Sequence, residues 1–187
     1  WKKVEKADSG AALYRDFLGG NAQALEELVK LYGDALTRFA YCIVKDDAAA
    51  EDVTADTFAA LIVKRKKFRE SAKFKTYLYT VARNRAIDYV RKNGKNRPLR
   101  GLENMLAGEE SDDIFKRERN EKLYACMQRL PATYQEVLYL SYFDGFSVKD
   151  ICRILKKSEK QVYNLLSRAK ATLKRHLVKE GFSHEDL

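Results

Sequence analysis

The sequence predicts an all-α protein with two small helical domains joined by a flexible acidic linker. Apolar residues recur at the 3.6-residue period of amphipathic helices over nearly the whole chain, with little of the alternation typical of strands. Nine glycines and two prolines among 187 residues leave few positions that break a helix. The periodicity fades over residues 93–113, where glycines, a proline and acidic residues are typical of a linker. The domains are therefore predicted at residues 1–92 and 114–187.

The first two long helices are predicted from a cap and from spacing. Asn21 is typical of a helix N-cap, and apolar residues then recur at helical spacing for about five turns. These apolar residues are Leu25, Leu28, Val29, Tyr32, Leu36, Phe39 and Ile43. A second helix begins after residues 45–47, with Phe58, Leu61 and Ile62 on its apolar side. Asp52 and Asp56, four residues apart, face away from Leu61.

A basic loop over residues 66–73 precedes a third helix, predicted from about Phe74 to Arg91. Its packing side is expected to hold Phe74, Tyr77, Leu78 and Val81. The opposite side gathers polar and aromatic residues, which are Thr76, Tyr79, Thr80, Arg83, Asn84 and Arg91. Aromatic and cationic side chains interleaved beside a basic loop suit unpaired bases better than an intact duplex. The alternative, which stays open, is that the tyrosines are half-buried and the cations only keep the protein soluble.

The C-terminal domain is predicted to include a helix that opens at Leu130–Pro131, with proline in its first turn. Residues expected to face the core of this domain are Tyr134, Val137, Leu138 and Tyr142. Further along, two short helices start with the same pattern eleven residues apart. Ser147 precedes Asp150 by three residues and Ser158 precedes Gln161 by three, and both pairs are typical of capping boxes.

The turn between these two short helices, at Lys156 and Lys157, completes a predicted helix-turn-helix. Apolar residues on the inner sides are Ile151, Ile154 and Leu155 in the first helix and Val162, Leu166, Ala169 and Leu173 in the second. The outward side of the second helix carries Lys160, Asn164, Ser167, Ala171 and Lys174, with Tyr163 and Arg168 beside it. Such donors suit a DNA groove and its phosphates. An ordinary amphipathic helix in a bundle is the alternative.

Charge is unevenly distributed along this chain of net charge +9. Residues 64–100 hold fourteen Lys and Arg against two acidic residues, and residues 149–179 hold ten against two. The rest of the chain is acidic in balance. This separation favours two surfaces that face nucleic acid, together with an acidic surface for a protein partner.

Catalysis and metal binding are not indicated. Cys42, Cys126 and Cys152 lie far apart in apolar helical patterns, and His176 and His184 lie near the end of the chain, so they are not spaced like metal ligands. We expect buried structural thiols. No nucleophile elbow or phosphate loop is present, so no enzyme and no cofactor are expected. Without a signal peptide or an apolar run of about 18 residues, the protein is expected in the cytoplasm, not inserted in a membrane.

Several strings, in order, resemble the extracytoplasmic-function class (group IV) of bacterial RNA polymerase sigma factors. AEDVTADTF at 50–58 is similar to the polymerase-binding helix of the family's second region, and FKTYLYTVARNRAIDYVR at 74–91 is similar to its promoter-melting helix. LPATYQEVLYLSYFDGFSVKDICRIL and SEKQVYNLLSRAKATL, which begin at residues 130 and 158, resemble the fourth region. Two positions depart from the pattern. This chain has Tyr77 where many members have Trp, and Leu165 where many members have Arg.

The resemblance implies a subunit that binds core RNA polymerase and promoter DNA and directs promoter recognition, melting and transcription initiation. It implies polymerase contacts through Glu51, Asp52 and Asp56. The implied contacts with the minus-10 element are Phe68, Arg69, Ser71, Lys73, Tyr79, Arg83 and Asn84. For the minus-35 element they are Lys160, Gln161, Tyr163, Asn164 and Arg168. An anti-sigma factor is an expected partner, and the free protein is expected to be a monomer.

Two other functions remain as alternatives at this stage. A stand-alone repressor or activator would use only the helix-turn-helix and would dimerise to read two half-sites. It would need neither the interleaved Tyr79 and Arg83 surface nor the Asp52 and Asp56 face. An adaptor that binds only proteins would tolerate replacement of the outward residues of the second capped helix.

Overall fold

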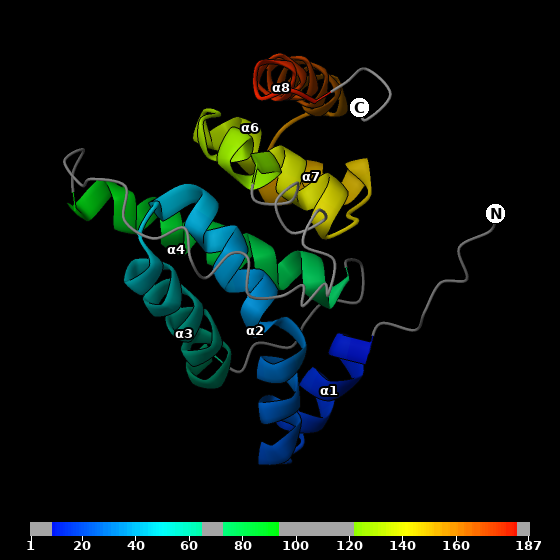
Figure 1. Cartoon of the computed structure of the whole chain (residues 1–187). Coiled ribbons are helices and arrows are strands. Elements are labelled where there is room, and N and C mark those ends of the chain that lie inside the picture. Colours follow the sequence, from blue (N-terminus) through cyan, green and yellow to red (C-terminus); the bar gives the residue numbers. More distant parts are fainter. Residues whose placement is uncertain (1–8, 65–72, 94–121, 183–187) are drawn as a thin grey trace, which may run out of the picture.

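The computed structural model describes residues 9–64, 73–93 and 122–182, and the regular structure of these residues is helical (Figure 1). Residues 122–128 are helical. The named helices are α1 (Ser9–Leu18), α2 (Ala22–Val44), α3 (Asp47–Lys64), α4 (Phe74–Asn93), α6 (Ala132–Leu138), the π-helix η2 (Tyr139–Phe143), α7 (Val148–Leu155) and α8 (Glu159–Lys179). The all-α prediction is confirmed.

The helices form two groups, which we call the N-terminal domain (α1–α4) and the C-terminal domain (residues 122–182). In the first group α2 packs against α1, α3 and α4, and in the second α8 packs against α6 and α7 (Figure 1). The groups also meet each other, because α7 packs on α4 and α6 packs on α2. The predicted linker begins one residue early, since Asn93 is the last residue of α4. Residues 94–121 lie outside the described part, so the predicted domain boundaries stay predictions.

Local sequence signals set the ends of α2 and the start of α3. The side chain of Asn21 accepts a hydrogen bond from the backbone N–H of Gln23, at 3.1 Å, as an N-cap residue does. Lys45 ends α2 in the left-handed conformation, with φ of 57°. The Asp46 carboxylate then accepts from the N–H of Ala49, at 2.9 Å, and satisfies a donor in the first turn of α3. The predicted helix break is confirmed, although α3 already begins at Asp47.

The core of the N-terminal domain uses most of the predicted apolar positions. Side chains with no exposed surface include Leu28, Leu36, Phe39, Phe74 and Leu78, and Leu61 is almost as deeply buried. Two predicted core residues are instead exposed, Val29 at 43% and Ile62 at 42%. Each lies at the margin of its helix's apolar stripe.

The C-terminal domain differs from its prediction where α6 continues into the π-helix η2. Pro131 is the N-cap of α6 and not a first-turn residue. Val137 and Leu138 are buried as expected, whereas Tyr142 is 56% exposed. A π-helical turn contains more residues than an α-helical turn, so side chains beyond it lose the 3.6-residue register. The prediction that Tyr142 faces the core is therefore wrong, and Tyr139 and Leu140 are buried instead.

The helix-turn-helix prediction is confirmed, although only the second of the two predicted capping boxes is complete. The Ser147 hydroxyl accepts from the N–H of Asp150 at 3.2 Å, and the same hydroxyl donates to the Asp150 carboxylate. Ser158 and Gln161 form a complete capping box, with bonds of 2.9 and 3.3 Å. Lys156 makes the corner between α7 and α8 with φ of 54°, in the left-handed region.

Candidate nucleic-acid and protein interfaces

The start of α8 is set by a local capping box, and two buried residues determine which face of the helix points outward. The capping box at Ser158 fixes where the helix begins, and Val162 and Ala169 are fully buried against the rest of the domain. The opposite side is therefore turned to solvent. All five predicted minus-35 residues are exposed there, which are Lys160, Gln161, Tyr163, Asn164 and Arg168. Their roles in binding DNA stay predictions.

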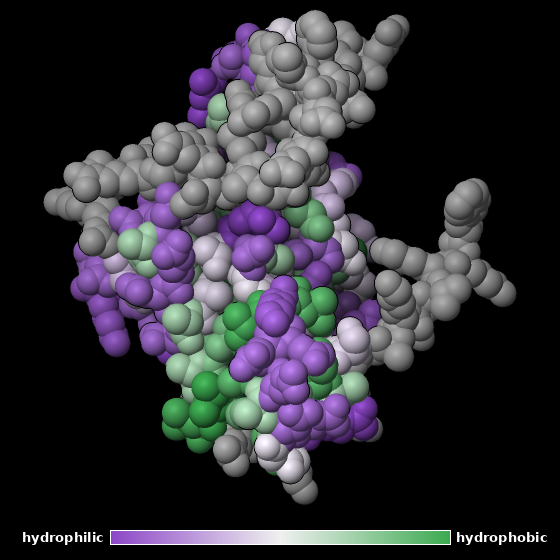
Figure 2. All heavy atoms as spheres, turned by 60° about the horizontal axis from the view of Figure 1, so that its bottom comes forward, coloured by the Kyte–Doolittle hydropathy of each residue, from purple (hydrophilic) through white to green (hydrophobic). Residues whose placement is uncertain are grey.

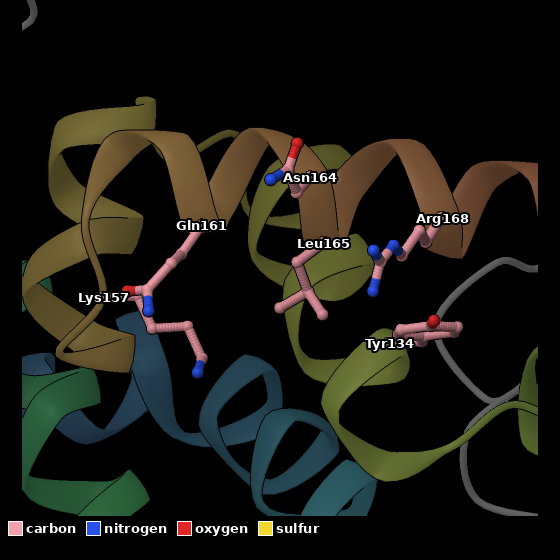
Figure 3. Close-up of a pocket in the computed structure, with 6 residues that line it drawn as sticks. All are labelled: Tyr134, Lys157, Gln161, Asn164, Leu165 and Arg168. Carbon is pink, nitrogen blue, oxygen red and sulfur yellow. The ribbon is translucent and has the colours of Figure 1, made fainter.

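An open hollow of about 250 Å³ lies beside this face (Figure 3). Its lining residues are Tyr134, Lys157, Gln161, Asn164, Leu165 and Arg168. Lys157 and Arg168 place cations on either side of Leu165, and Asn164 and Gln161 add amide groups (Figure 3). This combination of cations and amides suits phosphate oxygens and base edges. The sequence predicted Tyr134 in the core and Lys157 in the turn, and it did not predict that either lines this hollow. The hollow forms where α6 packs against α8.

The acidic face of α3 is exposed as predicted, with Glu51, Asp52 and Asp56 all open to solvent. Asp56 pairs with Arg85 of α4, at 3.2 Å, with side-chain exposures of 70% and 32%. Such a surface ion pair contributes only about 0–1 kcal/mol, so it leaves the carboxylate available to another protein.

Exposed apolar side chains accompany these carboxylates on α2 and α3. They are Val29, Leu31, Ile62 and Val63. Figure 2 brings the lower end of the molecule in Figure 1 forward and shows apolar surface bordering hydrophilic surface there. Apolar groups beside charges are typical of a surface that binds protein.

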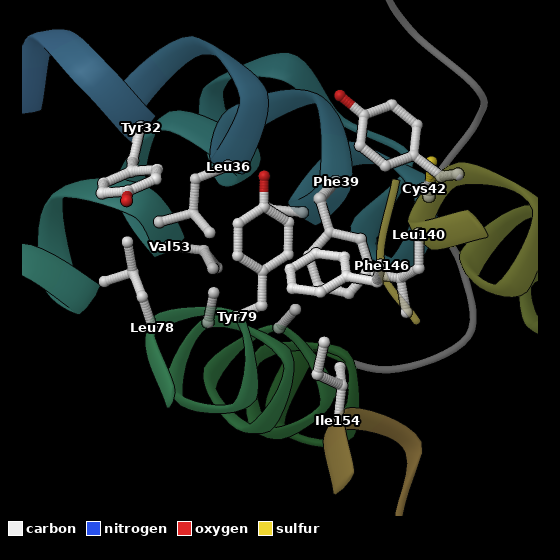
Figure 4. Packing of buried hydrophobic residues seen from close by; sticks show 14 of the residues in the cluster. Tyr32, Leu36, Phe39, Cys42, Val53, Leu78, Tyr79, Leu140, Phe146 and Ile154 are labelled. Atoms are coloured by element: carbon white, nitrogen blue, oxygen red, sulfur yellow. The ribbon is translucent and has the colours of Figure 1, made fainter. Parts of the chain in front are cut away.

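The polar side of α4 is covered by the C-terminal domain, which the sequence did not predict. Tyr79 has no exposed surface, and its ring centroid lies 5.1 Å from that of Phe39 and 4.9 Å from that of Phe146 (Figure 4). Thr76 is also buried, and its hydroxyl lies 3.1 Å from the carboxylate of Asp150 in α7. The prediction that Tyr79 and Thr76 lie on an open face is wrong for this conformation, because a second domain packs there.

Two cations of α4, Arg83 and Lys75, are likewise paired with the C-terminal domain. Arg83 Nε donates to Glu136 Oε2 at 2.6 Å, and these side chains are 14% and 5% exposed. Lys75 Nζ donates to the carbonyl of Asp144 at 2.9 Å and to its Oδ1 at 3.2 Å. Of the other predicted minus-10 residues, Asn84 and Lys73 are exposed. The remaining three, Phe68, Arg69 and Ser71, lie outside the described residues.

The hydroxyl of Tyr79 and Oδ2 of Asp144 are both buried in this contact, close enough for each group to affect the pKa of the other. Burial raises the pKa of Tyr79 well above its ordinary value, and the Asp144 carboxylate raises it further. Burial also raises the pKa of Asp144, while the Lys75 ammonium acts in the opposite direction. Buried polar groups are costly unless they find partners. The contact between the domains therefore includes polar groups from both of them.

Lys45 also lies between the domains. Its ammonium donates to the side-chain oxygens of Gln128, at 3.3 Å, and Gln135. Burial lowers the pKa of Lys45 from 10.5 to about 8, and the nearby Cys42 thiol and Glu136 carboxylate act against this shift.

Stability is expected to respond to pH through Lys45. Because the folded pKa, about 8, lies below the unfolded value of 10.5, the unfolded chain binds more protons between these values. The free energy of unfolding contributed by Lys45 should therefore rise as the pH increases from about 8 to 10.5. Denaturant unfolding of the wild type and of Lys45→Met across this range measures the difference. Lys160→Met, which removes an exposed lysine, is the control, and parallel curves for all three proteins would contradict the assignment.

The three cysteines are free thiols. Cys42 and Cys126 are buried as predicted, and burial raises the pKa of Cys42 to about 12, so its thiolate is scarce at neutral pH. Cys152 is only partly buried, because it lies at the edge of the apolar side of α7. Among the described residues, no cluster of His, Cys, Asp and Glu could hold a metal ion. In the same part of the chain, no helix has the length and apolar character needed to cross a membrane.

The sequence matches two families in the order of the two domains. It matches Sigma-70 region 2 over residues 28–96 and Sigma-70 region 4 over residues 120–173. The ECF RNA polymerase sigma factor SigM of Bacillus subtilis is 30% identical over 152 residues, with 80% of this chain and 93% of SigM covered. The ECF RNA polymerase sigma factor BldN of Streptomyces coelicolor is 29% identical over 180 residues, with 91% of this chain and 68% of BldN covered.

Solved structures share the fold. The sigma factor RpoE of Bartonella quintana, crystallised with the anti-sigma factor NepR, aligns with a TM-score of 0.67 at 23% identity, over 81% of this chain and 95% of that one. CnrH, solved with the cytosolic domain of CnrY, aligns with a TM-score of 0.66 at 22% identity, over 93% of this chain and 99% of that one. The two-domain helical architecture is therefore a known one.

Proposed function

Because the chain belongs to the extracytoplasmic-function sigma factors of bacterial RNA polymerase, we propose that it binds core polymerase and directs promoter recognition, DNA melting and transcription initiation. The observation that carries this proposal is the pair of family matches, in order, on a fold whose second domain presents a capped helix-turn-helix. Sigma factors are initiation factors that act by binding, and this protein is accordingly not an enzyme. Its work takes place in the bacterial cytoplasm, where polymerase and promoter DNA are found.

The minus-35 element is read by α8 in the major groove. Amide side chains at Asn164 and Gln161 can bond base edges, whereas Lys160 and Arg168 can pair with bases or phosphates. Tyr163 adds an exposed aromatic ring on the same face. The hollow between Lys157 and Arg168 supports a nearby phosphate contact, because both cations border it.

The minus-10 element is opened and held by α4 and the segment before it. The proposed residues are Phe68, Arg69, Ser71, Lys73, Tyr79, Arg83 and Asn84. Stacking a base on an aromatic side chain returns about 1–3 kcal/mol, comparable to the few kcal/mol needed to flip it from the duplex. Aromatic and cationic groups on one helix can therefore tip the balance toward melting once polymerase holds the DNA.

Core polymerase binds the acidic face of α3 through Glu51, Asp52 and Asp56. The exposed carboxylates, with apolar side chains beside them, support this assignment. An anti-sigma factor that covers the same face would prevent the association. RpoE, which shares the fold, was crystallised with the anti-sigma factor NepR, and this supports an anti-sigma factor as a partner here. The free chain is proposed to be a monomer, since each domain reads one promoter element and no second half-site is needed.

Run-off transcription with purified bacterial core polymerase and a library of promoter DNA tests the proposed function. Specific initiation that requires this protein would support the proposal and reveal both promoter elements. A protein that gives no initiation but binds duplex DNA as a dimer would instead be a stand-alone regulator, and the proposed function would be wrong.

Two substitutions in α8 are expected to separate base reading from phosphate binding. Asn164→Ala should cost about 1–3 kcal/mol at one minus-35 position and relax the preference there. Arg168→Ala should weaken binding to all promoters and lower the slope of log affinity against log salt by about one. Binding of the polymerase complex to promoter variants at several salt concentrations measures both effects. Lys30→Ala, an exposed cation of α2, is the control. Equal losses at every position for both variants would contradict the distinction.

A further inference from the structure

The first helix of the helix-turn-helix, α7, has a basic side that is turned to solvent. Ile151 and Ile154 bury the opposite side of this helix in the core. At 3.6 residues per turn, Lys149, Arg153 and Lys156 fall within about 60° of one another around the helix axis. All three are exposed. We call these three residues the α7 stripe.

The charges of α7 are separated between its two sides. The carboxylate of Asp150 is turned inward, where it lies 3.1 Å from the hydroxyl of Thr76. Within the part of the chain that the structure describes, no side chain of the α7 stripe forms an ion pair or a hydrogen bond. Lys149 and Arg153 are four residues apart, and like charges at this spacing destabilise a helix. A surface that served only solubility would mix its signs, so the stripe suits an anionic ligand.

Lys156 brings its cation to a backbone position that favours glycine. Its φ of 54° and ψ of 47° lie in the left-handed region, where a residue with a Cβ is strained. Glycine is the usual residue in this conformation at the end of a helix. The chain therefore carries a lysine here at an energetic cost. Strain that is kept in this way indicates that the side chain has a use.

The α7 stripe is continuous with the face of α8 that is proposed to read the minus-35 element. Lys156 is followed by Lys157, which lines the hollow beside Asn164 and Arg168 (Figure 3). When the second helix of a helix-turn-helix lies in the major groove, the first crosses the DNA backbone. Lys149 and Lys156 are separated by about 10 Å along the helix, at about 1.5 Å per residue. One DNA strand advances about 3.4 Å per nucleotide, so the stripe matches about three phosphates.

We propose that the α7 stripe binds phosphates of the duplex immediately beside the minus-35 element, so that the C-terminal domain covers more DNA than the bases read by α8. This inference rests on the proposed function, because it needs α8 in the major groove of that element. It goes further in assigning a second DNA surface to the domain. That surface adds affinity without base preference, because every phosphate is chemically the same.

Replacing two cations of the α7 stripe tests the proposal in the complex with core polymerase. Lys149→Gln/Arg153→Gln is expected to lower the slope of log affinity against log salt by about two, and its deficit should shrink about tenfold between about 50 and 200 mM salt. Its preference among minus-35 variants should not change. The matched control, Arg15→Gln/Lys30→Gln, removes one arginine and one lysine at exposed positions of the N-terminal domain. An unchanged slope, or the same change in the control, overturns the proposal.

Neutral phosphates locate the contact on the DNA. Promoter duplexes carry single methylphosphonate groups, which lack the phosphate charge, at successive positions on both sides of the minus-35 element. Two or three neighbouring positions should weaken binding of the wild type and leave binding of Lys149→Gln/Arg153→Gln unchanged. Asn164→Ala, which alters a proposed base contact, should stay sensitive at the same positions. If no position distinguishes the stripe variant from the wild type, the proposal is wrong.

Lys156→Gly separates a DNA contact from a structural role. Glycine adopts a positive φ without strain, so the melting temperature should stay equal or rise. Promoter affinity should nevertheless fall, and the salt slope should decrease by about one. A variant that is as stable as the wild type and keeps its full salt slope contradicts the proposal.

The same proteins distinguish this inference from the proposed function. If the wild type gives specific initiation but neutral phosphates affect the stripe variant and the wild type equally, only the inference is ruled out. If the stripe variant loses affinity for core polymerase and keeps its salt slope on DNA, the α7 stripe binds an acidic protein surface, and the proposal is wrong. If the wild type neither initiates nor binds minus-35 DNA, the proposed function fails, and the inference fails with it.

Discussion

Replacing Phe39 with alanine is expected to lower the free energy of unfolding by about 3–5 kcal/mol, the usual range for removal of a buried phenylalanine. Phe39 has no exposed surface, and its ring centroid lies 5.1 Å from that of Tyr79 and 6.2 Å from that of Tyr139 (Figure 4). The ring thus contacts α4 of its own domain and η2 of the other. Its removal leaves a cavity where the two domains meet, so both the N-terminal core and the domain contact should weaken.

Denaturant unfolding monitored by circular dichroism measures this loss. Phe39→Leu keeps most of the apolar volume and should cost much less than the alanine variant. Val63→Ala is the exposed control, because Val63 is 82% exposed and its truncation should change stability by less than about 0.5 kcal/mol. If Phe39→Ala were no more destabilising than Val63→Ala, the central position of Phe39 in the core would be wrong.

Reversing the charge of Asp52 and Asp56 together is expected to reduce affinity for core polymerase by about tenfold or more, as loss of close charge pairs at an interface does. Both carboxylates are exposed on α3. The fold should remain intact, because exposed substitutions seldom change stability by more than about 0.5 kcal/mol. Loss of the exposed ion pair between Asp56 and Arg85 adds at most about 1 kcal/mol to that cost.

Binding to core polymerase immobilised on a surface measures the affinity of Asp52→Lys/Asp56→Lys and of the wild type. The matched control is Glu26→Lys/Glu27→Lys, which makes the same change of charge at exposed positions of α2. A specific loss in the α3 variant, with an unchanged melting temperature, would support the assignment. Equal losses in both variants would mean that net charge alone governs the association, and retention of full affinity in the α3 variant would exclude this face.

Most of the helices, though not α1, could be predicted from the sequence because their ends depend on residues only a few positions apart. Asn21 bonds the backbone two residues ahead, and Ser158 bonds the backbone three residues ahead. The helix over Phe74–Asn93 was predicted to within two residues of its end for the same reason. Such contacts form within a single turn, so they are readable before any tertiary structure is known.

The predictions that were wrong depend on structure beyond a single helical turn. Tyr142 was assigned to the core from a 3.6-residue period, but the π-helical turn at Tyr139–Phe143 shifts the register and exposes it. Val29 follows the apolar period of α2 yet is exposed, because a periodic position is buried only if another helix covers it. The periodicity predicts which side of a helix is apolar, but it does not predict how much of that side the neighbouring helices cover.

The sequence by itself determined the helix starts, the turn at Lys156 and the outward face of α8, since local hydrogen bonds and one apolar stripe specify them. Only the tertiary structure decided whether the polar side of α4 is open. Arg83 and Glu136 are 53 positions apart, and Thr76 and Asp150 are 74 apart, so no local pattern could pair them. Burial of Tyr79 depends on how a distant domain docks, and that is a property of the packed molecule.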